Sequence, residues 1–405
     1  MAFQALSEEI LLKGLCTSCG ICEVVCPKKI IEMDALHPKL KGTSAYDACG
    51  DCQECVNVCP GKETSVQVSE TNLFGRVRAP EERWLGIYKY AFSGHSNIED
   101  VFQKSSSGGC STTLLLAAME SMNLDFVLVA GRDAVSPWKA TSIVCRNKEE
   151  LLASTQSTYQ LFPHLRILKD VIEKNPKARI GMSALPCQVH AIRKLQRVDS
   201  LAGEFARNNI LFLLEVACSS STKVQGTETF VEEKMNIELS RITDLKYRAG
   251  EYPGNMAVHT KDNVHEGAFW ELVRHLKSFK THRCLSCGDW MSGLADVSVC
   301  DGDPNIFASS VDKDDPIQKH GRILVRTEAG LNALEYGYEK NWITTWGTDL
   351  GGFNLGLERK RNRRAFYERS DMPIPDSPIP GYVEDIEIIP DEKLIAIPET
   401  RKENA

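Results

Sequence analysis

The sequence has 405 residues, of which 42% are hydrophobic and 25% are charged, so we expect a globular protein of two or three domains. Its net charge of −7 argues against nucleic acid as a partner, because that partner requires a basic face. The longest apolar runs fall well short of the roughly 20 residues that cross a bilayer, so no transmembrane segment is expected. Fifteen cysteines without a visible signal peptide indicate a reducing compartment, and we expect a cytoplasmic protein.

Two cysteine runs with the same spacing open the chain. Residues 16–27 and 49–60 each read C-x-x-C-x-x-C-x-x-x-C-P. In this bacterial ferredoxin run, three cysteines hold one [4Fe–4S] cluster and the fourth ligates the other cluster. The expected ligand sets are therefore Cys16, Cys19, Cys22 and Cys59 for one cluster, and Cys49, Cys52, Cys55 and Cys26 for the second.

The alternatives for these runs are two zinc ribbons or a disulfide scaffold. Zinc usually takes paired C-x-x-C units, whereas these runs hold four cysteines and end in proline. We therefore predict an α+β ferredoxin-like N-terminal domain with two [4Fe–4S] clusters over residues 1–70. The charged stretch 71–99 is predicted as a linker.

Strands and helices alternate from about residue 100. The sequence predicts short buried strands, two helices and a parallel or mixed sheet, with strands at 126–130, 179–183 and 210–216 and helices at 112–122 and 188–195. We expect this α/β domain to cover residues 100–370. Prolines and acidic residues dominate 371–405, which is predicted to be an extended C-terminal tail.

Four later segments carry the remaining motifs. They are SSSGGCST at 105–112, GMSALPCQ at 181–188, EVACS at 215–219, and CLSCGD at 284–289 followed by LADVSV and DGDP. Small residues before a helix let backbone N–H groups approach an anion, although an ordinary capped turn is the alternative. The start of a helix favours a thiolate at Cys187. Buried apolar cysteines at 187 and 218, and half a zinc site at 284 and 287, are the alternatives.

In this order the four segments resemble the coenzyme F420 hydrogenase/dehydrogenase beta-subunit family. The resemblance implies that the second domain is an α/β flavin- and Fe–S-binding domain. It implies a third [4Fe–4S] cluster held by Cys187, Cys218, Cys284 and Cys287. It also implies FAD contacts from Ser106, Ser107, Gly108, Gly109, Thr112, Ser157 and Tyr159.

The chain departs from the family pattern at two positions. Gln156 stands where members tend to have glycine before Ser157, and Cys300 stands where they tend to have glycine before a Gly-Asp pair. We interpret Cys300 as a residue that fills space. The segment around Arg248 often borders the family's active site, where an arginine meets either an acidic coenzyme tail or a surface carboxylate.

The resemblance implies an iron–sulfur flavoprotein that moves electrons between reduced coenzyme F420 and the clusters. FAD is needed because deazaflavins deliver hydride, whereas cubane clusters accept one electron at a time. We expect other redox subunits or a ferredoxin as partners, in an oligomer or hetero-complex, and name no catalytic residue. The alternatives are a flavin-free electron-conduit subunit, a relative that reduces another substrate, and structural zinc at the later cysteines.

Overall fold

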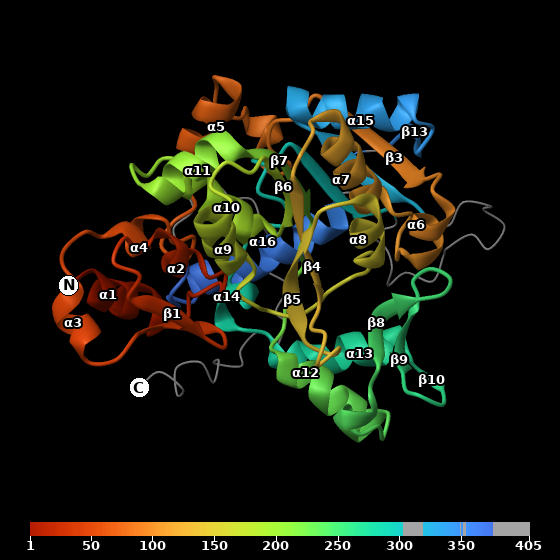
Figure 1. Ribbon diagram of the computed structural model, residues 1–405, viewed down its shortest axis with the longest axis horizontal. Coiled ribbons are helices and arrows are strands. Elements are labelled where there is room, and N and C mark those ends of the chain that lie inside the picture. The colour runs from red at the N-terminus through yellow and green to blue at the C-terminus, as the bar shows by residue number, and fades with distance from the viewer. Residues whose placement is uncertain (303–318, 349, 351–353, 376–405) are drawn as a thin grey trace.

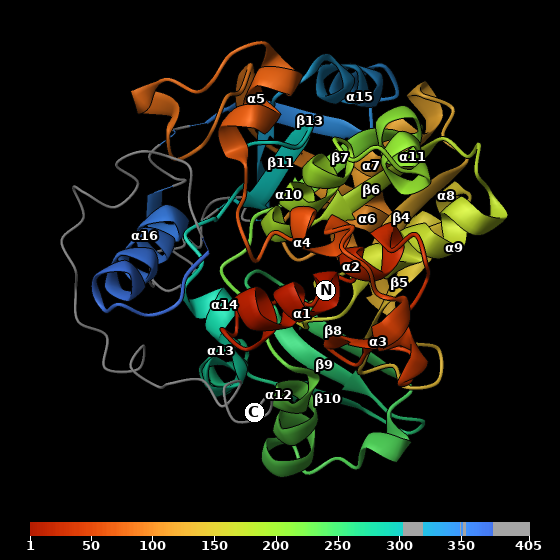
Figure 2. The ribbon, with the colours of Figure 1, turned by 90° about the vertical axis from the view of Figure 1, so that its left-hand side faces the viewer.

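The computed structural model describes residues 1–302, 319–348, 350 and 354–375. The N-terminal cysteine module lies on one flank of a central sheet, at the left of Figure 1, and a small second sheet lies below. Figure 2, turned by 90°, shows the N-terminal helices in front of the central sheet and helix α16 (Asn354–Arg369) to one side.

Short helices and one antiparallel hairpin make up the cysteine module. Its elements are α1 (Ala2–Leu6), α2 (Ile21–Val25), β1 (Ile31–Asp34), β2 (His37–Leu40), α3 (Ser44–Ala48), α4 (Glu54–Asn57) and α5 (Val66–Phe74). Each cysteine run enters a helix, so that Cys22 lies in α2 and Cys55 in α4. Most of these helices have only four or five residues, a length that is not stable without tertiary support.

The larger part of the chain is built on an eight-stranded sheet. Its strands are β3 (Tyr90–Ser96), β4 (Phe126–Arg132), β5 (Ala140–Cys145), β6 (Ile180–Ala184), β7 (Ile210–Val216), β11 (Val297–Asp301), β12 (Gly321–Val325) and β13 (Ile343–Gly347). Their order is β13-β3-β12-β11-β7-β6-β4-β5. The inner strands β4, β6, β7 and β11 run parallel. The other four pair antiparallel, so the sheet is mixed, as the alternating pattern predicts.

Helices cover both faces of this sheet. Alternate residues of β7 point to opposite faces, with Phe212 and Leu214 in one core and Leu213 in the other. The first core includes residues of α7 (Cys110–Ser121), α8 (Lys148–Ala153) and α15 (Glu328–Glu339). The second includes residues of α9 (Ile167–Lys174), α10 (Pro186–Leu195), α11 (Leu201–Asn209) and the cysteine module. The module therefore shares a hydrophobic core with the sheet domain.

A smaller sheet with its own core follows β7 in the chain. Strands β8 (Asp244–Ala249), β9 (Asn255–His259) and β10 (Val264–Gly267) pair antiparallel. Helices α12 (Val224–Thr229) and α13 (Phe269–Leu276) contact one another, and α13 also contacts β9. The remaining helices are α6 (Glu99–Lys104) and α14 (His282–Leu285).

The helices and strands predicted from residue 100 onward all form. Helix α7 begins two residues before the predicted 112–122, and α10 two residues before the predicted 188–195. Strands β4 and β6 overlap their predicted ranges, and β7 has the predicted bounds.

The stretch 71–99 is more than a linker. Strand β3 lies inside it and pairs with both β12 and β13, in the interior of the eight-stranded sheet. The charged residues at 76–83, on which the linker prediction rested, lie only in the first part of the stretch. Of the predicted C-terminal tail, residues 376–405 lie outside the described residues, and the Asp-Pro of the DGDP segment at 303–304 does too.

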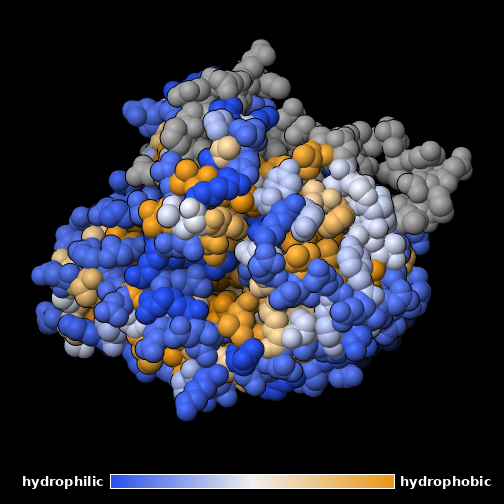
Figure 3. Space-filling view, turned by 90° about the horizontal axis from the view of Figure 1, so that it is seen from above, coloured by the Kyte–Doolittle hydropathy of each residue, from blue (hydrophilic) through white to orange (hydrophobic). Residues whose placement is uncertain are grey.

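Seen from above, the surface is largely hydrophilic, with smaller hydrophobic areas near its centre (Figure 3). Within the part of the chain that the structure describes, no helix combines the length and apolarity needed to cross a membrane.

Candidate functional site

The first predicted ligand set comes together within the cysteine module. Cys22 interacts electrostatically with Cys16, Cys19 and Cys59, and Cys59 interacts with Cys19. Backbone N–H groups point at two of the sulfurs, from Ser18 to Cys16 Sγ at 3.3 Å and from Gly61 to Cys59 Sγ at 3.4 Å. The fourth cysteine of the second run thus joins the first three of the first run.

The second predicted set lines one cavity at the edge of the module. Cys26, Cys49, Cys52 and Cys55 all face this cavity, together with Ala2, Pro27 and Lys28. Cys55 interacts with the other three cysteines. Cys52 is exposed, so this group lies at the surface of the module.

Burial keeps the thiols of Cys55 and Cys59 protonated in the absence of a metal. It raises the pKa of Cys55 to about 12 and that of Cys59 to about 11, and neighbouring cysteines add to both shifts. A bound metal deprotonates a coordinating thiol outright, and binding releases the protons. These cysteine groups are therefore suited to binding metal and not to reactions of a free thiolate.

Three distant segments bring together Cys187, Cys218, Cys284 and Cys287. Cys187 interacts electrostatically with Cys218 and Cys287, and Cys218 with Cys284 and Cys287. Because these residues lie up to 100 positions apart in the sequence, only the fold places them side by side.

Local hydrogen bonds hold each of the three segments. Helix α10 starts directly after β6, where the Leu185 N–H donates to Gln188 Oε1 at 2.8 Å. The Cys218 N–H donates to the Trp290 carbonyl at 3.0 Å, which ties the end of β7 to the chain after Cys287. The Cys284 N–H donates to Thr281 Oγ1 at 3.4 Å and caps the start of α14.

Buried cations surround this third cysteine group, and the sequence motifs did not predict them. Arg283 and Lys360 are each 2% exposed. Burial alone would raise the pKa of Cys287, but Lys360 and Arg283 lower it. Lys280 is nearby, and burial together with Arg363 and Lys360 lowers its pKa to about 7. Lys360 comes from α16, far from any cysteine in sequence, so no local signal could have revealed it.

One buried histidine completes the surroundings of this group. His190 on α10 lies 3.4 Å from Asp289, measured from Nε2 to Oδ2. Asp289 in turn donates its backbone N–H to Cys287 Sγ at 3.4 Å. Among the described residues, no three His, Cys, Asp or Glu side chains converge closely enough for a single metal ion.

The predicted flavin loop lies against the second predicted flavin segment. Ser106 Oγ and Ser157 Oγ are 2.6 Å apart, and Thr155 Oγ1 donates to Thr112 Oγ1 at 3.3 Å. Gly109 ends the loop as the N-cap residue of the twelve-residue helix α7. Residues 106–112 and 155–159 therefore form one polar surface at the N-terminus of α7.

Both glycines of the loop have a left-handed backbone that other residues rarely adopt. Gly108 has φ of 79° and Gly109 has φ of 77°. A Cβ atom at Gly108 would lie 2.8 Å from the Lys319 carbonyl oxygen, and one at Gly109 would lie 2.6 Å from Val101 Cγ1. Ser107 precedes the two glycines, and its carbonyl oxygen lies next to Gly321. The loop thus requires glycine at both positions.

Arg132, which no sequence motif indicated, holds the segment 155–159 in place. Its guanidinium donates to Thr158 Oγ1 at 2.8 Å and to the Ser157 carbonyl at 2.7 Å. It also donates to the Leu245 carbonyl at 3.1 Å and lies over the Tyr247 ring. The only available signal was an arginine two residues after the predicted buried strand at 126–130.

A second arginine stands next to Tyr159. Arg248, which is itself buried, forms an ion pair with the partly exposed Asp301 at 2.9 Å and donates to the Pro253 carbonyl at 2.6 Å. Its Nη2 atom is buried and has no hydrogen-bond partner. Tyr159 packs edge-on against Tyr247, and burial raises the pKa of Tyr159. Arg248 therefore does meet a carboxylate, as one expectation had it, but the arginine side chain lies below the surface.

The three cysteines without a predicted ligand role lie in apolar surroundings. Cys110 is buried and donates to the Gly94 carbonyl at 3.0 Å. Cys145 ends the edge strand β5 and is fully buried. Cys300 packs against the apolar cluster of Trp290, Met291 and Leu324, which agrees with a residue that fills space.

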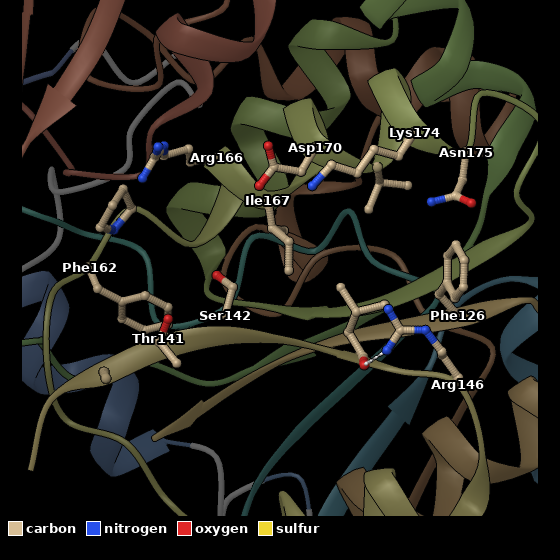
Figure 4. A pocket seen from close by; sticks show the side chains of 14 residues that line it. Phe126, Thr141, Ser142, Arg146, Phe162, Arg166, Ile167, Asp170, Lys174 and Asn175 are labelled. Atoms are coloured by element: carbon tan, nitrogen blue, oxygen red, sulfur yellow. Dashed lines mark hydrogen bonds between the residues drawn. The ribbon is translucent and has the colours of Figure 1, made fainter. Parts of the chain in front are cut away.

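A separate open groove runs between β5 and α9 (Figure 4). It has a volume of about 390 Å³ and is lined by, among others, Ser142, Arg146, Phe162, Asp170 and Lys174. None of the predicted site residues lines it.

Family models match most of the chain between residues 15 and 349. Residues 91–169 match the model described as "Coenzyme F420 hydrogenase/dehydrogenase, beta subunit N-term", and 177–349 match its "C terminus" counterpart. Together these two matches cover more than half of the chain. Residues 15–63 match a 4Fe-4S dicluster domain. The predicted flavin loop falls in the first match, and the third cysteine group in the second.

Curated relatives and a solved structure agree with these matches. The chain is 25% identical to the coenzyme F420 hydrogenase subunit beta of Methanothermobacter thermautotrophicus, over 68% of this chain and 90% of the relative. It is 28% identical to the coenzyme F420-dependent sulfite reductase of Methanocaldococcus jannaschii, over 81% of this chain but only 47% of that protein. A chain of the F420-reducing [NiFe] hydrogenase complex from Methanosarcina barkeri has a similar fold, with a TM-score of 0.56 and 20% identity over 73% of this chain and 94% of that chain.

Proposed function

The chain belongs to the coenzyme F420 hydrogenase/dehydrogenase beta subunit family and carries a 4Fe–4S dicluster domain, and on that premise we propose what it does. We propose that it is an oxidoreductase subunit that exchanges hydride with coenzyme F420 and passes electrons through iron–sulfur clusters to a partner protein. Two relatives named for F420 support the substrate, because they align over two thirds or more of this chain.

We propose three cluster sites. Cys16, Cys19, Cys22 and Cys59 would hold the first cluster, and Cys26, Cys49, Cys52 and Cys55 the second. Cys187, Cys218, Cys284 and Cys287 would hold the third. Clusters of this kind take up and release one electron at a time.

The observation that carries the proposal is the position of the third group beside the first. Cys187 interacts electrostatically with Cys19 of the module as well as with Cys218 and Cys287. Cysteines from the module and from the sheet domain thus lie next to one another. Cys22 of the first group also interacts with Cys55 of the second group, which contains the exposed Cys52. This order supports electron flow between the sheet domain and the surface of the module.

The surface formed by residues 106–112 and 155–159 would hold FAD. The N-terminus of α7 favours the pyrophosphate charge, and the hydroxyls of Ser106, Thr112 and Ser157 offer hydrogen bonds. Arg248 interacts with Tyr159, and its Nη2 atom is buried without a hydrogen-bond partner, which also fits an anionic or carbonyl group. When bound, FAD would supply the exchange between hydride and single electrons.

A partner must take or supply the electrons. The exposed Cys52 places the second cluster site at the surface, where a redox subunit or a ferredoxin would dock. The relatives named as beta subunits support membership of a hetero-complex.

The test is the cofactor content and activity of anaerobically purified protein. We expect about twelve irons and one FAD per chain, and bleaching of reduced F420 coupled to reduction of a viologen. Cys187→Ala/Cys218→Ala should lower the iron content to about eight, because two thiolates cannot hold a cubane. Cys145→Ser, also a change at a buried cysteine, should retain about twelve.

Two outcomes would contradict the proposal. About eight irons and no flavin in the wild-type protein would leave a two-cluster electron conduit. Turnover with another donor but none with F420 would reject the substrate and retain the flavoprotein.

A further inference from the structure

Arg283 lies between the third cysteine group and the cysteine module. It is 2% exposed and precedes Cys284 in the short helix α14. It interacts electrostatically with Cys187, Cys284 and Cys287, and it also acts on Cys19 in the module. One side chain therefore faces sulfur atoms of two proposed cluster sites.

The Arg283 guanidinium has hydrogen-bond donors without an acceptor in the protein. Its Nε and Nη2 atoms are buried and have no hydrogen-bond partner. An isolated buried charge is costly, so buried arginines normally meet carboxylates or other anions. Asp289 is the nearby carboxylate, and it is also paired with His190. The free N–H groups therefore point to a further anionic group between the two domains.

A sulfur-ligated cluster is such a group. A cubane with four thiolates carries net negative charge, and each one-electron reduction adds another negative charge. Hydrogen bonds and charges near the sulfurs set how easily that reduction occurs. A fixed cation within reach of two clusters stabilises the electron on either of them.

We infer that Arg283 is a positioning residue shared by the first and third clusters and that its charge makes both of them easier to reduce. The inference rests on the cluster sites proposed above. The effect should be unequal, because Arg283 is the largest electrostatic influence on Cys187 and a minor one on Cys19.

Lys360 provides a matched control on the same site. It is as buried as Arg283, and it acts on Cys218 and Cys287 of the third group. It comes from α16, which does not belong to the shared core of the module and sheet domain. Its removal should therefore affect the third cluster alone.

The experiment is a redox titration of the purified holoprotein followed by electron paramagnetic resonance. The variant Cys187→Ala/Cys218→Ala lacks the third cluster and so assigns its signals. For Arg283→Gln we expect the midpoint potential of the third cluster to fall by about 59 mV, which is a tenfold change in its one-electron reduction equilibrium. The midpoint potential of the first cluster should fall by less. Arg283→Lys, which keeps the charge, should restore most of both shifts.

The control and the contrary outcomes separate this inference from the proposed function. Lys360→Gln should shift the third cluster and leave the first unchanged. Unchanged potentials in an iron-replete Arg283→Gln protein, or a shift of the third cluster alone, would overturn the inference and spare the cluster sites. Wild-type protein without a third cluster would overturn both.

Discussion

The second and third cysteine groups differ in how the chain assembles them. Cys26, Cys49, Cys52 and Cys55 come from two short runs in one small module, around a cavity that reaches the surface. The third group comes from three segments of the sheet domain and is enclosed by buried cations. One group depends on local spacing, and the other depends on a completed fold.

This difference predicts different responses to the loss of metal. Helices of four or five residues are not stable alone, and a small module with little core depends on its metal for folding. The sheet domain has a hydrophobic core on each face of β7, and only one of these cores is shared with the module, so we expect the sheet to keep its shape without a metal. The groups should therefore lose structure to very different extents when iron is removed.

The largest expected effect is that of iron removal on the cysteine module. In apoprotein we expect the amides of residues 15–63 to lose most of their protection against hydrogen exchange. The inner strands β4, β6 and β7 should keep theirs, because their ladders lie between two hydrophobic cores. Mass spectrometry of holoprotein and apoprotein measures both. Equal protection of 15–63 in the two forms would show that packing on the sheet domain, and not metal, holds the module.

A buried ion pair that joins the two regions gives the next effect. Glu23 in α2 is almost fully buried and accepts from Lys169 Nζ at 2.8 Å and from the Met33 N–H at 2.9 Å. Glu23→Gln leaves Lys169 without its charge partner at this interface. We expect the free energy of unfolding to fall by about 2 kcal/mol at pH 7 in denaturant titrations.

An exposed pair across the same interface is the matched control. Lys29 and Glu173 also join the module to α9, but both side chains are well exposed. Glu173→Gln should therefore leave the stability almost unchanged, because exposed ion pairs contribute little. If both variants lose the same free energy of unfolding, the contribution of an ion pair at this interface does not depend on its burial.

The effect of Glu23→Gln should also depend on pH. Burial alone would raise the pKa of Glu23, but the hydrogen bonds from Lys169 and Met33 and the charge of Arg166 lower it below its ordinary 4.5. The stabilisation by the carboxylate is then complete above that ordinary pKa and is lost as the pH falls through the lower, folded-state value. The difference between wild type and Glu23→Gln should accordingly stay constant above the ordinary pKa of 4.5 and shrink as the pH falls below it.

Local patterns predicted most elements and the two cysteine sets of the module, whereas the third set was implied by the family resemblance. The cysteine spacing at 16–27 and 49–60 determines locally which cysteines come together. The buried run at 210–216 forms β7 with the predicted bounds. Residues that act across the fold left no such pattern. Arg283 and Lys360 meet at the third group only after α14 and α16 are placed, and β3 was hidden because its pairing partners lie over 200 residues away.

The smallest expected effect concerns Arg132, which holds predicted contact residues without having been predicted itself. Arg132→Gln removes the charged donors to Thr158 and to the Ser157 carbonyl, so the 155–159 segment should lose its fixed position beside Ser106. We expect FAD to bind about tenfold more weakly, or about 1.4 kcal/mol, in a titration followed by flavin fluorescence. Arg146→Gln, at the exposed end of β5, should bind FAD as wild type does. If Arg132→Gln binds FAD normally, the loop at 106–109 alone holds the flavin, and this site is as local as the cysteine module. If binding weakens, the flavin site resembles the third cysteine group, because its contacts depend on a side chain that only the fold brings to them.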